Sequence, residues 1–207
     1  MSELSIGAIV PFGGYQFRVL DIQNNAALLL TEEIIEQRGY HDAYKHTTWA
    51  DCALRKYLNR AFYEAFNEDD RSRIVPTINR NADNPWYGAA GGEDTQDYVF
   101  LLSVEEVACK YFGDSSANLY HRGANQRYWL QRRDENNCRR RAKAQGCIWW
   151  WWLRTPGRDH LKAVYIHGDG NIGIQGNNIF RRSSTACSHP INGENQGGVR
   201  PALWVKL

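Results

Sequence analysis

Four consecutive tryptophans, at positions 149–152, constrain the fold of this chain more than any other feature. Each indole carries a large apolar area, and several exposed side by side would promote aggregation. We therefore expect most of this run to be buried, together with Trp204. The chain has 207 residues, 43% of them hydrophobic, which is enough to build the core that this burial needs.

The remaining composition predicts a fold of the α+β class. Besides eight Trp, the chain has eleven Tyr and eighteen Gly, and glycine permits the tight turns that connect short strands. The length is ordinary for one domain with long ordered loops, so we predict a single domain over residues 1–207. The formal net charge of +2 gives no reason to expect a nucleic acid as the partner.

The cysteines and the first residues of the chain indicate which metal or disulfide sites and which cellular location to expect. The five cysteines are an odd number without a CxxC pair, so we predict neither a disulfide framework nor a zinc site, and we expect no cofactor. The first residues lack a basic segment followed by a long apolar core, which predicts no signal peptide. No segment approaches the roughly 20 apolar residues of a membrane helix. We expect a cytoplasmic protein without membrane insertion, or one displayed on a phage or cell surface through a partner.

Hydrophobic patterning predicts strands in both halves of the chain. Early strands are expected over Ile6–Pro11, Tyr15–Ile22 and Ala26–Thr31, with a turn at Gly13-Gly14 between the first two. Residues 74–92 are rich in Asn, Pro and Gly and predict a long ordered loop. Later strands are expected at Val99–Leu102, Ile148–Leu153, Val164–His167, Asn171–Ile174 and Val199–Leu207.

Two segments predict helices by their capping residues. Thr48 followed by Asp51 forms a capping-box pattern, and Ser103 followed by Glu106 forms another. The second helix is expected to end at Gly113. Residues 131–143 are charged and predict a short solvated helix or a loop. The first helix is expected to bury one face made of Leu54, Tyr57, Leu58, Ala61, Phe62 and Phe66.

Two motifs carry a family resemblance. Trp149–Gly157 has the sequence WWWWLRTPG, and Gly198–Leu207 has the sequence GVRPALWVKL. They resemble the WWLRSPG and GVRPALW signatures of a gut-bacterial domain family that includes the variable proteins of diversity-generating retroelements. The similarity covers nearly the whole chain, because it extends to Tyr15–Ile22, Thr31–Arg38, Trp49–Asn59, Trp86–Asp94 and Phe100–Gly113.

The resemblance implies a C-type-lectin-like fold. In that fold two helices flank mixed and antiparallel sheets of short strands, the first and last strands meet, and long ordered loops present the ligand surface. It implies a scaffold over roughly residues 1–146, a variable ligand-binding region over roughly 147–198 and a closing strand over 199–207. The implied function is that of a receptor or adhesin without catalytic activity. Its partner would be a macromolecular ligand, either a protein or a component of a cell surface.

The diversification mechanism of such systems predicts which residue types can vary. A reverse transcriptase copies a template with errors at adenines, so Asn codons become codons for many other residues but not readily for Trp, Lys, Glu, Gln or Met. Residues 158–161 and 177–192 all belong to the reachable set. Gln175, Glu194 and Gln196 do not belong to it, and we expect these three positions to be fixed.

Strand geometry supports the same surface from the residues themselves. Side chains alternate along a strand, so Val164 and Ile166 are expected to face the core. Tyr165, His167 and Asp169 are expected to face water or the ligand. Arg154 and Arg200 of the family motifs are expected to pin loops through hydrogen bonds to backbone carbonyls or carboxylates.

The candidate ligand-binding residues combine this face with the reachable positions around it. Large side chains with a polar end are common in binding surfaces. The expected anchors are Tyr165, Phe180, Arg181 and Arg182. Their expected neighbours are Arg158, Asp159, His160, Leu161, His167, Asp169, Asn171, Gly173, Asn177 and Asn178.

Other site chemistries have less support in the spacing of residues. His41 and His46 lack a third ligand at metal-binding spacing. The sequence Asp169-Gly170-Asn171 lacks the spacing of an EF-hand calcium loop. The basic run Arg132–Lys143 is interrupted by two acidic residues, which favours a solvated helix face over phosphate binding.

Two alternative functions stay open. Gly198-Val199-Arg200 is distantly similar to a carboxyl-terminal motif of the formylglycine-generating enzymes, oxidases whose reactive cysteines lie close together. That function would require Cys147 and Cys187 to meet in space. A structural component of a phage tail is the other alternative. No Ser/His/Asp or Cys/His grouping and no phosphate-binding loop can be assembled from the spacing, which favours a protein that is not an enzyme.

Overall fold

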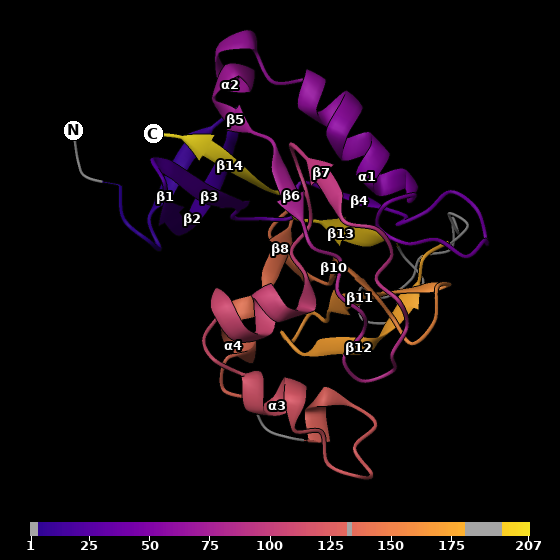
Figure 1. Cartoon of the computed structure of the whole chain (residues 1–207). Helices are drawn as coiled ribbons and strands as arrows, with labels where there is room; N and C mark the ends of the chain where they lie inside the picture. The colour runs from indigo at the N-terminus through magenta and orange to yellow at the C-terminus, as the bar shows by residue number, and fades with distance from the viewer. Residues whose placement is uncertain (1–3, 132–133, 181–195) are drawn as a thin grey trace.

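The computed structural model describes residues 4–131, 134–180 and 196–207. The fold is α+β, with short strands in two five-stranded sheets and two small hairpins, and with short helices beside them (Figure 1). The strands are β1 (Ile9–Phe12), β2 (Tyr15–Gln23), β3 (Ala26–Thr31), β4 (Glu36–Arg38), β5 (Ile74–Val75), β6 (Thr77–Asn79), β7 (Thr95–Asp97), β8 (Ala142–Ala144), β9 (Cys147–Trp149), β10 (Trp151–Pro156), β11 (Lys162–Ile166), β12 (Ile172–Asn178), β13 (Gly197–Val199) and β14 (Ala202–Lys206). The helices are α1 (Ala53–Tyr57), α2 (Glu68–Arg73), α3 (Ser116–Tyr120) and α4 (Asn137–Arg140), with π-helical turns η1 (Leu58–Phe62) and η2 (Glu106–Lys110) and a 3-10 turn η3 (Trp129–Gln131).

The first sheet brings the earliest and latest strands together. Its order is β1-β2-β3-β14-β5, and all of its neighbours are antiparallel. Leu203 of β14 pairs with Leu29 of β3, and the backbone N–H of Leu207 donates to the carbonyl of Asn25 at 3.0 Å. The last strand thus meets β3 and not, as expected, the first strand. Successive hairpins place β1 at the edge, because β2 lies between β1 and β3.

The second sheet is mixed and ends in a hairpin. Its order is β12-β11-β10-β13-β4, with β13 parallel to β10 and the other neighbours antiparallel. The predicted strands Val164–His167 and Asn171–Ile174 are confirmed within the β11–β12 hairpin, apart from the outermost residues His167 and Asn171. The hairpin therefore has one strand at the edge of the sheet and one strand inside it.

The predicted single strand over Val199–Leu207 is wrong, because the chain changes sheets within it. β13 ends at Val199 in the second sheet, and β14 begins at Ala202 in the first. Pro201 has no N–H to offer a sheet. The Arg200 side chain turns inward, where its Nε donates to the carbonyl of Thr31 at 2.8 Å.

The tryptophan run is buried, as expected, and alternates between two faces. The exposed fractions of residues 149–152 range from 0% to 7%. The rings of Trp150 and Trp152 meet with centroids 4.7 Å apart, whereas Trp151 packs against Phe112 at 6.3 Å. Trp204, which was also expected to be buried, is only half-buried on β14.

The first helix begins later than the sequence predicted. The Sγ of Cys52 accepts a hydrogen bond from the backbone N–H of Arg55 at 3.3 Å, so Cys52 caps α1, which starts at Ala53. The expected cap, Thr48, belongs to the preceding turn. Ala61, which was expected on the buried apolar face of this helix, is exposed. The wider turn of a π-helix shifts the helical period, and Ala61 lies within η1.

The second predicted capping box is confirmed. The backbone N–H of Ser103 donates to Oε2 of Glu106 at 2.7 Å, and the backbone N–H of Glu106 donates to Oγ of Ser103 at 3.2 Å. Each side chain thus satisfies a backbone group at the start of the helix. The helical segment ends before Gly113, as predicted.

The predicted strand Val99–Leu102 is buried but forms only an isolated bridge, between Phe100 and Ala202. Side chains take the place of strand partners on both sides of this bridge. The carbonyl of Val99 accepts from Asn59 Nδ2 at 2.9 Å, and the carbonyl of Leu101 accepts from Arg154 Nη1 at 2.8 Å. A regular ladder cannot form where these carbonyls are already occupied.

The predicted loop contains short strands, and the charged segment contains a short helix, which is one of the two forms predicted for it. The expected loop at residues 74–92 contains β5 and β6, and the charged segment at residues 131–143 contains α4 and part of β8. Figure 1 shows α1 and α2 close to the first sheet, and α3 and α4 at the opposite end, near β12. Over the residues described, none of the helices combines the length and the apolar character needed to cross a membrane.

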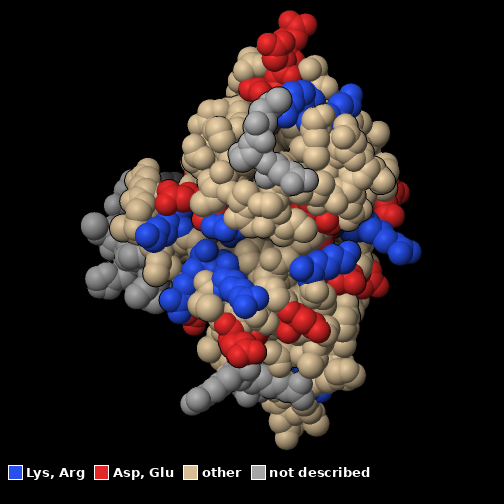
Figure 2. Space-filling view, turned by 90° about the vertical axis from the view of Figure 1, so that its left-hand side faces the viewer, with Lys and Arg blue, Asp and Glu red and all other residues tan. Residues whose placement is uncertain are grey.

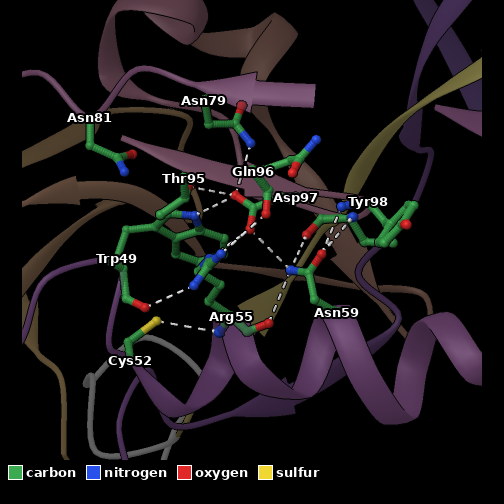
Figure 3. A network of polar contacts seen from close by, with 12 residues as sticks. Trp49, Cys52, Arg55, Asn59, Asn79, Asn81, Thr95, Gln96, Asp97 and Tyr98 are labelled. Atoms are coloured by element: carbon green, nitrogen blue, oxygen red, sulfur yellow. Dashed lines mark hydrogen bonds and ion pairs between the residues drawn. The ribbon is translucent and has the colours of Figure 1, made fainter. Parts of the chain in front are cut away.

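A buried carboxylate ties the first helix to the β6–β7 hairpin (Figure 3). Asp97 is 1% exposed, and the Nε of Arg55 lies 2.6 Å from its Oδ1. Burying a carboxylate costs free energy unless it is paired and hydrogen-bonded. Asp97 accepts hydrogen bonds from the side chains of Trp49, Arg55, Asn59, Asn79 and Thr95.

The two motif arginines pin loops as expected. Arg154 contacts the carboxylate of Glu106 through two hydrogen bonds, of 2.5 and 3.0 Å. Arg200 donates to the carbonyls of Thr31 and Glu32. Both arginines are nearly buried, and burial lowers the pKa of Arg200 to about 10.

Candidate ligand-binding surface

The candidate residues lie on and around the β11–β12 hairpin. In its antiparallel register, Lys162 is opposite Asn178 at one end, and Ile166 is opposite Ile172 at the other. The structure separates the candidates into two groups near these ends. Two of the expected anchors, Arg181 and Arg182, lie outside the described residues.

The first group surrounds the open end of the hairpin, where the chain enters and leaves it. Arg158 and Asp159 are exposed by 59% and 43% and form an ion pair of 3.4 Å. Nε2 of His160 lies 2.9 Å from the carbonyl oxygen of Ala90, so a neighbouring loop supports this end. The members of the first group are Arg158, Asp159, His160, Leu161, Asn177, Asn178 and Phe180, of which Phe180 is half-buried against the core.

The open end is held in place by a buried amide. Asn84 is 1% exposed, and its Nδ2 donates to the carbonyls of Pro156 and Ile174 at 2.9 and 2.8 Å. These two carbonyls belong to β10 and β12, which β11 separates in the sheet. The loop that contains Asn84 therefore fixes the spacing of the strands beneath the first group.

The second group surrounds the turn that connects β11 to β12. The Oδ1 of Asp169 accepts from the backbone N–H of Asn171 at 2.9 Å and lies 3.1 Å from Nδ1 of His167. The side chains of His167 and Asp169 are 42% and 46% exposed. The members of the second group are Tyr165, His167, Asp169, Asn171 and Gly173.

The predicted alternation of side chains along β11 is confirmed. Val164 and Ile166 are fully buried in the core. Tyr165 is half-buried on the opposite face, where its ring centroid lies 5.4 Å from that of Trp150 at an interplanar angle of 74°. Tyr165 therefore links the second group directly to the buried tryptophans.

Two candidate residues are not surface residues, which corrects the sequence-based expectation. Gly173 is buried because the Tyr165 ring covers it from the neighbouring strand, leaving no room for a β-carbon. Asn171 is 5% exposed because the turn folds it inward, with its carbonyl accepting from the backbone N–H of His167 at 2.8 Å. Neither residue can present a side chain to a flat partner surface.

These two residues instead line a hollow beside the turn. The hollow has a volume of about 120 Å³, and residues 128–130 form one side of it while hairpin residues between Tyr165 and Gln175 form the other. The exposed fractions of Tyr128 and Leu130 are 48% and 66%. The structure thus brings a segment from outside the predicted variable region against the second group.

A buried ion pair holds Trp129, one of the residues that line the hollow, in place. Trp129 is 1% exposed, and its Nε1 donates to Oδ2 of Asp134 at 2.8 Å. The same oxygen accepts from Nη1 of Arg140 at 2.8 Å. Burial opposes the ionisation of Asp134, but the hydrogen bond and charge of Arg140 outweigh it and lower the pKa of this carboxyl. The segment that carries Tyr128 and Leu130 is therefore connected to α4 through Trp129, Asp134 and Arg140.

The sequence-based reasoning did not identify Tyr128 or Leu130. The available signal was the presence of large apolar side chains within a polar segment, Asn125–Gln131. Such side chains are as typical of a local core as of a binding surface, and only their exposure distinguishes the two cases. Ile148, which is 49% exposed and packs beside Gly168, is a third such residue near the turn.

The basic run is interrupted in space as well as in sequence. Arg139, Arg141 and Lys143 are exposed, as expected for a solvated face, but Arg140 is fully buried. Arg132 and Arg133 lie outside the described residues. Figure 2 shows Lys and Arg side chains gathered across the middle of one face, with Asp and Glu side chains between and below them. Charges of both signs therefore share this surface.

The residues considered for metal or oxidase chemistry lie only partly within the described chain. Over residues 4–131, 134–180 and 196–207, no three His, Cys, Asp or Glu side chains are grouped so that they could hold a metal ion. His41 instead accepts a hydrogen bond at Nδ1 from the backbone N–H of Ala53 at 3.2 Å. Cys147 is exposed on β9, and Cys187 lies outside the described residues.

Comparison with known proteins identifies one family. A family model described as a domain of unknown function, DUF6273, matches residues 24–207. No curated protein and no solved structure matches the chain. The family match covers the second sheet and the whole candidate surface, whereas β1 and β2 of the first sheet precede it.

Proposed function

We propose that this chain, which belongs to the DUF6273 family, is a ligand-binding protein without catalytic activity whose surface residues are diversified by a retroelement reverse transcriptase. Its ligand is a macromolecule, either a protein or a component of a cell surface. The fold that we propose for it is C-type-lectin-like. Three features support this fold: the last strand returns to the sheet of the early strands, helices lie beside that sheet, and a second sheet of short strands carries long loops.

The observation that carries the proposal is the contrast between the two faces of one hairpin. Val164 and Ile166 are completely buried, while the side chains of His167 and Asp169 on the same hairpin are nearly half exposed. Substitutions at exposed positions remove few contacts and change stability little. A hairpin of this kind tolerates changes on its outer face without unfolding of the domain.

The framework under the hairpin supports the proposal for the same reason. Trp150 and Trp152 contact each other on the Tyr165 side of the sheet, and the indole N–H of Trp152 donates to the carbonyl of Arg38 at 2.9 Å. The buried aromatic area holds β10 rigid whatever side chains the hairpin presents. A rigid support lowers the entropic cost of binding for each variant.

The first test is genomic. We expect a reverse transcriptase gene beside the coding region, together with a near-copy of its 3′ end that differs only at template adenines. Codons for exposed residues such as Arg158 and Asp169 should differ between the two copies, and codons for Trp151 and Trp152 should not. Absence of both the gene and the near-copy would contradict the diversification mechanism.

The second test is a binding measurement on a ligand selected with this variant from a displayed protein library. Replacing both His167 and Asp169 by Ala should weaken binding at least about tenfold, while the free energy of unfolding changes by less than about 1 kcal/mol. Arg60→Ala, an exposed change on η1, is the matched control. Tyr165 and Phe180 are less suitable positions, because both side chains also pack against the core.

Two outcomes would contradict the proposal directly. Unchanged binding by the double variant would show that the hairpin turn is not the ligand surface. Stoichiometric copper bound by Cys147 and Cys187 would favour the oxidase alternative.

A further inference from the structure

We propose that the hollow beside the β11–β12 turn binds the guanidinium group of an arginine side chain on a protein partner. This inference rests on the proposed function, since it specifies the chemistry of one part of the same ligand surface. It is carried by the hydrogen-bond acceptors, aromatic walls and charge of the residues around the hollow.

The first observation is an excess of acceptors. Asn171 lines the hollow and is 5% exposed, and its Oδ1 is buried without a hydrogen-bond partner among the described residues. A buried acceptor left unpaired costs free energy, and a ligand donor that reaches this oxygen through a small shift of the Asn171 side chain relieves that cost. The Asp169 carboxylate lines the same hollow and adds a charged acceptor. An arginine side chain offers five N–H donors and no acceptor.

The second observation is the aromatic character of the walls. Tyr128 and Tyr165 both line the hollow, one from the segment before η3 and one from β11. A planar guanidinium stacks on aromatic rings more readily than an ammonium does, because it is delocalised and less strongly hydrated. The volume of about 120 Å³ is several times what one water needs, and it suits the end of a single side chain.

The third observation is the charge of the lining. Asp169 is the acidic residue on the wall, and no Lys or Arg of the described residues lines the hollow. Two arginines lie just outside it. Arg141 donates from Nε to the backbone carbonyl of Asp169 at 3.3 Å, and the Arg127 guanidinium lies 6.0 Å from the centre of the Tyr128 ring. Both would repel a bound cation weakly, so removing one of them should strengthen binding.

The experiment titrates the full chain with N-acetylarginine amide and follows the backbone amide signals by NMR. N-acetylcitrulline amide, which has nearly the same shape but no charge, is the comparison ligand. We expect saturable shifts at residues 128–130 and 165–175, and binding of the arginine compound at least about tenfold tighter than that of the citrulline compound.

Three variants refine the titration. Asp169→Asn should weaken arginine binding about tenfold or more, because it keeps an acceptor for the Asn171 N–H but removes the charge. Arg141→Ala should strengthen binding, because it removes the neighbouring cation. Asp69→Asn is the matched control, because Asp69 is exposed on α2, outside the candidate surface, and it should leave binding unchanged.

The inference is overturned if no saturable shifts occur up to about 50 mM arginine compound, or if both compounds bind equally well. Equal effects of Asp169→Asn and Asp69→Asn would overturn it as well. Failure here is distinguishable from failure of the proposed function, because the genomic near-copy does not depend on what the hollow binds. A protein with that near-copy and no arginine binding retains the proposed function and loses only this inference.

Discussion

The ring of Tyr165 covers the Cα of Gly173 on the neighbouring strand so closely that any β-carbon at position 173 would overlap the ring. On its other side the same ring meets Trp150. One position proposed to vary is therefore coupled to another through direct contact. A side chain at position 173 would require Tyr165 to leave the tryptophan framework.

This contact predicts that Gly173→Ala destabilises the protein by about 1–3 kcal/mol, as overpacking does in other cores. Unfolding in urea, followed by tryptophan fluorescence, measures the change. The loss should be smaller in a Tyr165→Ala background, with a coupling free energy of at least about 0.5 kcal/mol. Gly168→Ala, in the turn of the same hairpin, is the control and should cost less, because its β-carbon would meet only a methyl group of Ile148, at 3.3 Å. Additive effects of Gly173→Ala and Tyr165→Ala would show that the two positions vary independently.

The Asp97 network predicts a large effect of a small substitution. Asp97→Asn removes the charge that pairs with Arg55 and leaves several donors without a charged acceptor. We expect a loss of about 3–5 kcal/mol in the free energy of unfolding. Asp51→Asn is the control, since Asp51 is exposed, and its effect should stay within about 0.5 kcal/mol. A loss below about 1 kcal/mol for Asp97→Asn would mean that the network contributes little to stability.

Two carboxylates predict acid-sensitive stability. Burial opposes the ionisation of Glu106, but the charge and hydrogen bonds of Arg154 outweigh it and lower the pKa of Glu106 below its ordinary value of 4.5. The pKa of Asp134 is likewise below its ordinary value of 3.8, because Arg140 outweighs burial. A lowered folded-state pKa contributes stability above the ordinary value, and that stability is lost as the pH falls through the folded-state pKa.

We therefore expect the free energy of unfolding to fall as the pH decreases from about 5 to about 3, measured by urea denaturation at each pH. Glu106→Gln should lower stability at neutral pH by about 2–4 kcal/mol, because Arg154 loses its carboxylate, and should flatten the acid dependence. Glu105→Gln, an exposed change one residue earlier, should preserve the slope. An equally steep dependence in Glu106→Gln would exclude Glu106 as its source.

Cysteine environments predict a clear order of reactivity. Burial raises the pKa of the Cys52 thiol to about 12, whereas Cys138 and Cys147 are exposed. The thiolate is the reactive form. In a Cys187→Ser background, an alkylating reagent at neutral pH should modify Cys138 and Cys147 in the folded protein and Cys52 only after denaturation. Peptide mapping by mass spectrometry identifies the modified residues, and rapid modification of folded Cys52 would contradict its placement as the buried cap of α1.

The fold could be predicted best where the signal lies within a few residues of sequence. Strand alternation located β2 and distinguished Val164 from Tyr165, a continuous apolar run located β3, and the Ser103 capping box located its helix start. The same signal misplaced the first helix. There the sulfur of Cys52, which lies in the core, caps the helix in place of the hydroxyl of Thr48.

The candidate site could be predicted only in part. The hairpin was identified from its own residues, but its division into two groups follows from the length of the strands and from the loops at each end. The contribution of Tyr128 and Leu130 could not be predicted, because it depends on how the Asp134–Arg140 pair positions Trp129 beside a hairpin that lies more than thirty residues further along the chain.

The amino-acid sequence by itself determined that the run of four tryptophans is buried and that the hairpin has an inner and an outer face. These properties depend on hydrophobicity and on the two-residue period of a strand, which act locally. Only the tertiary structure decided which face of Gly173 is covered, where the chain changes sheets at Arg200-Pro201, and which distant segment completes the hollow. Those outcomes depend on the packing of segments far apart in sequence, where the shape of each contact is set by all of its neighbours at once.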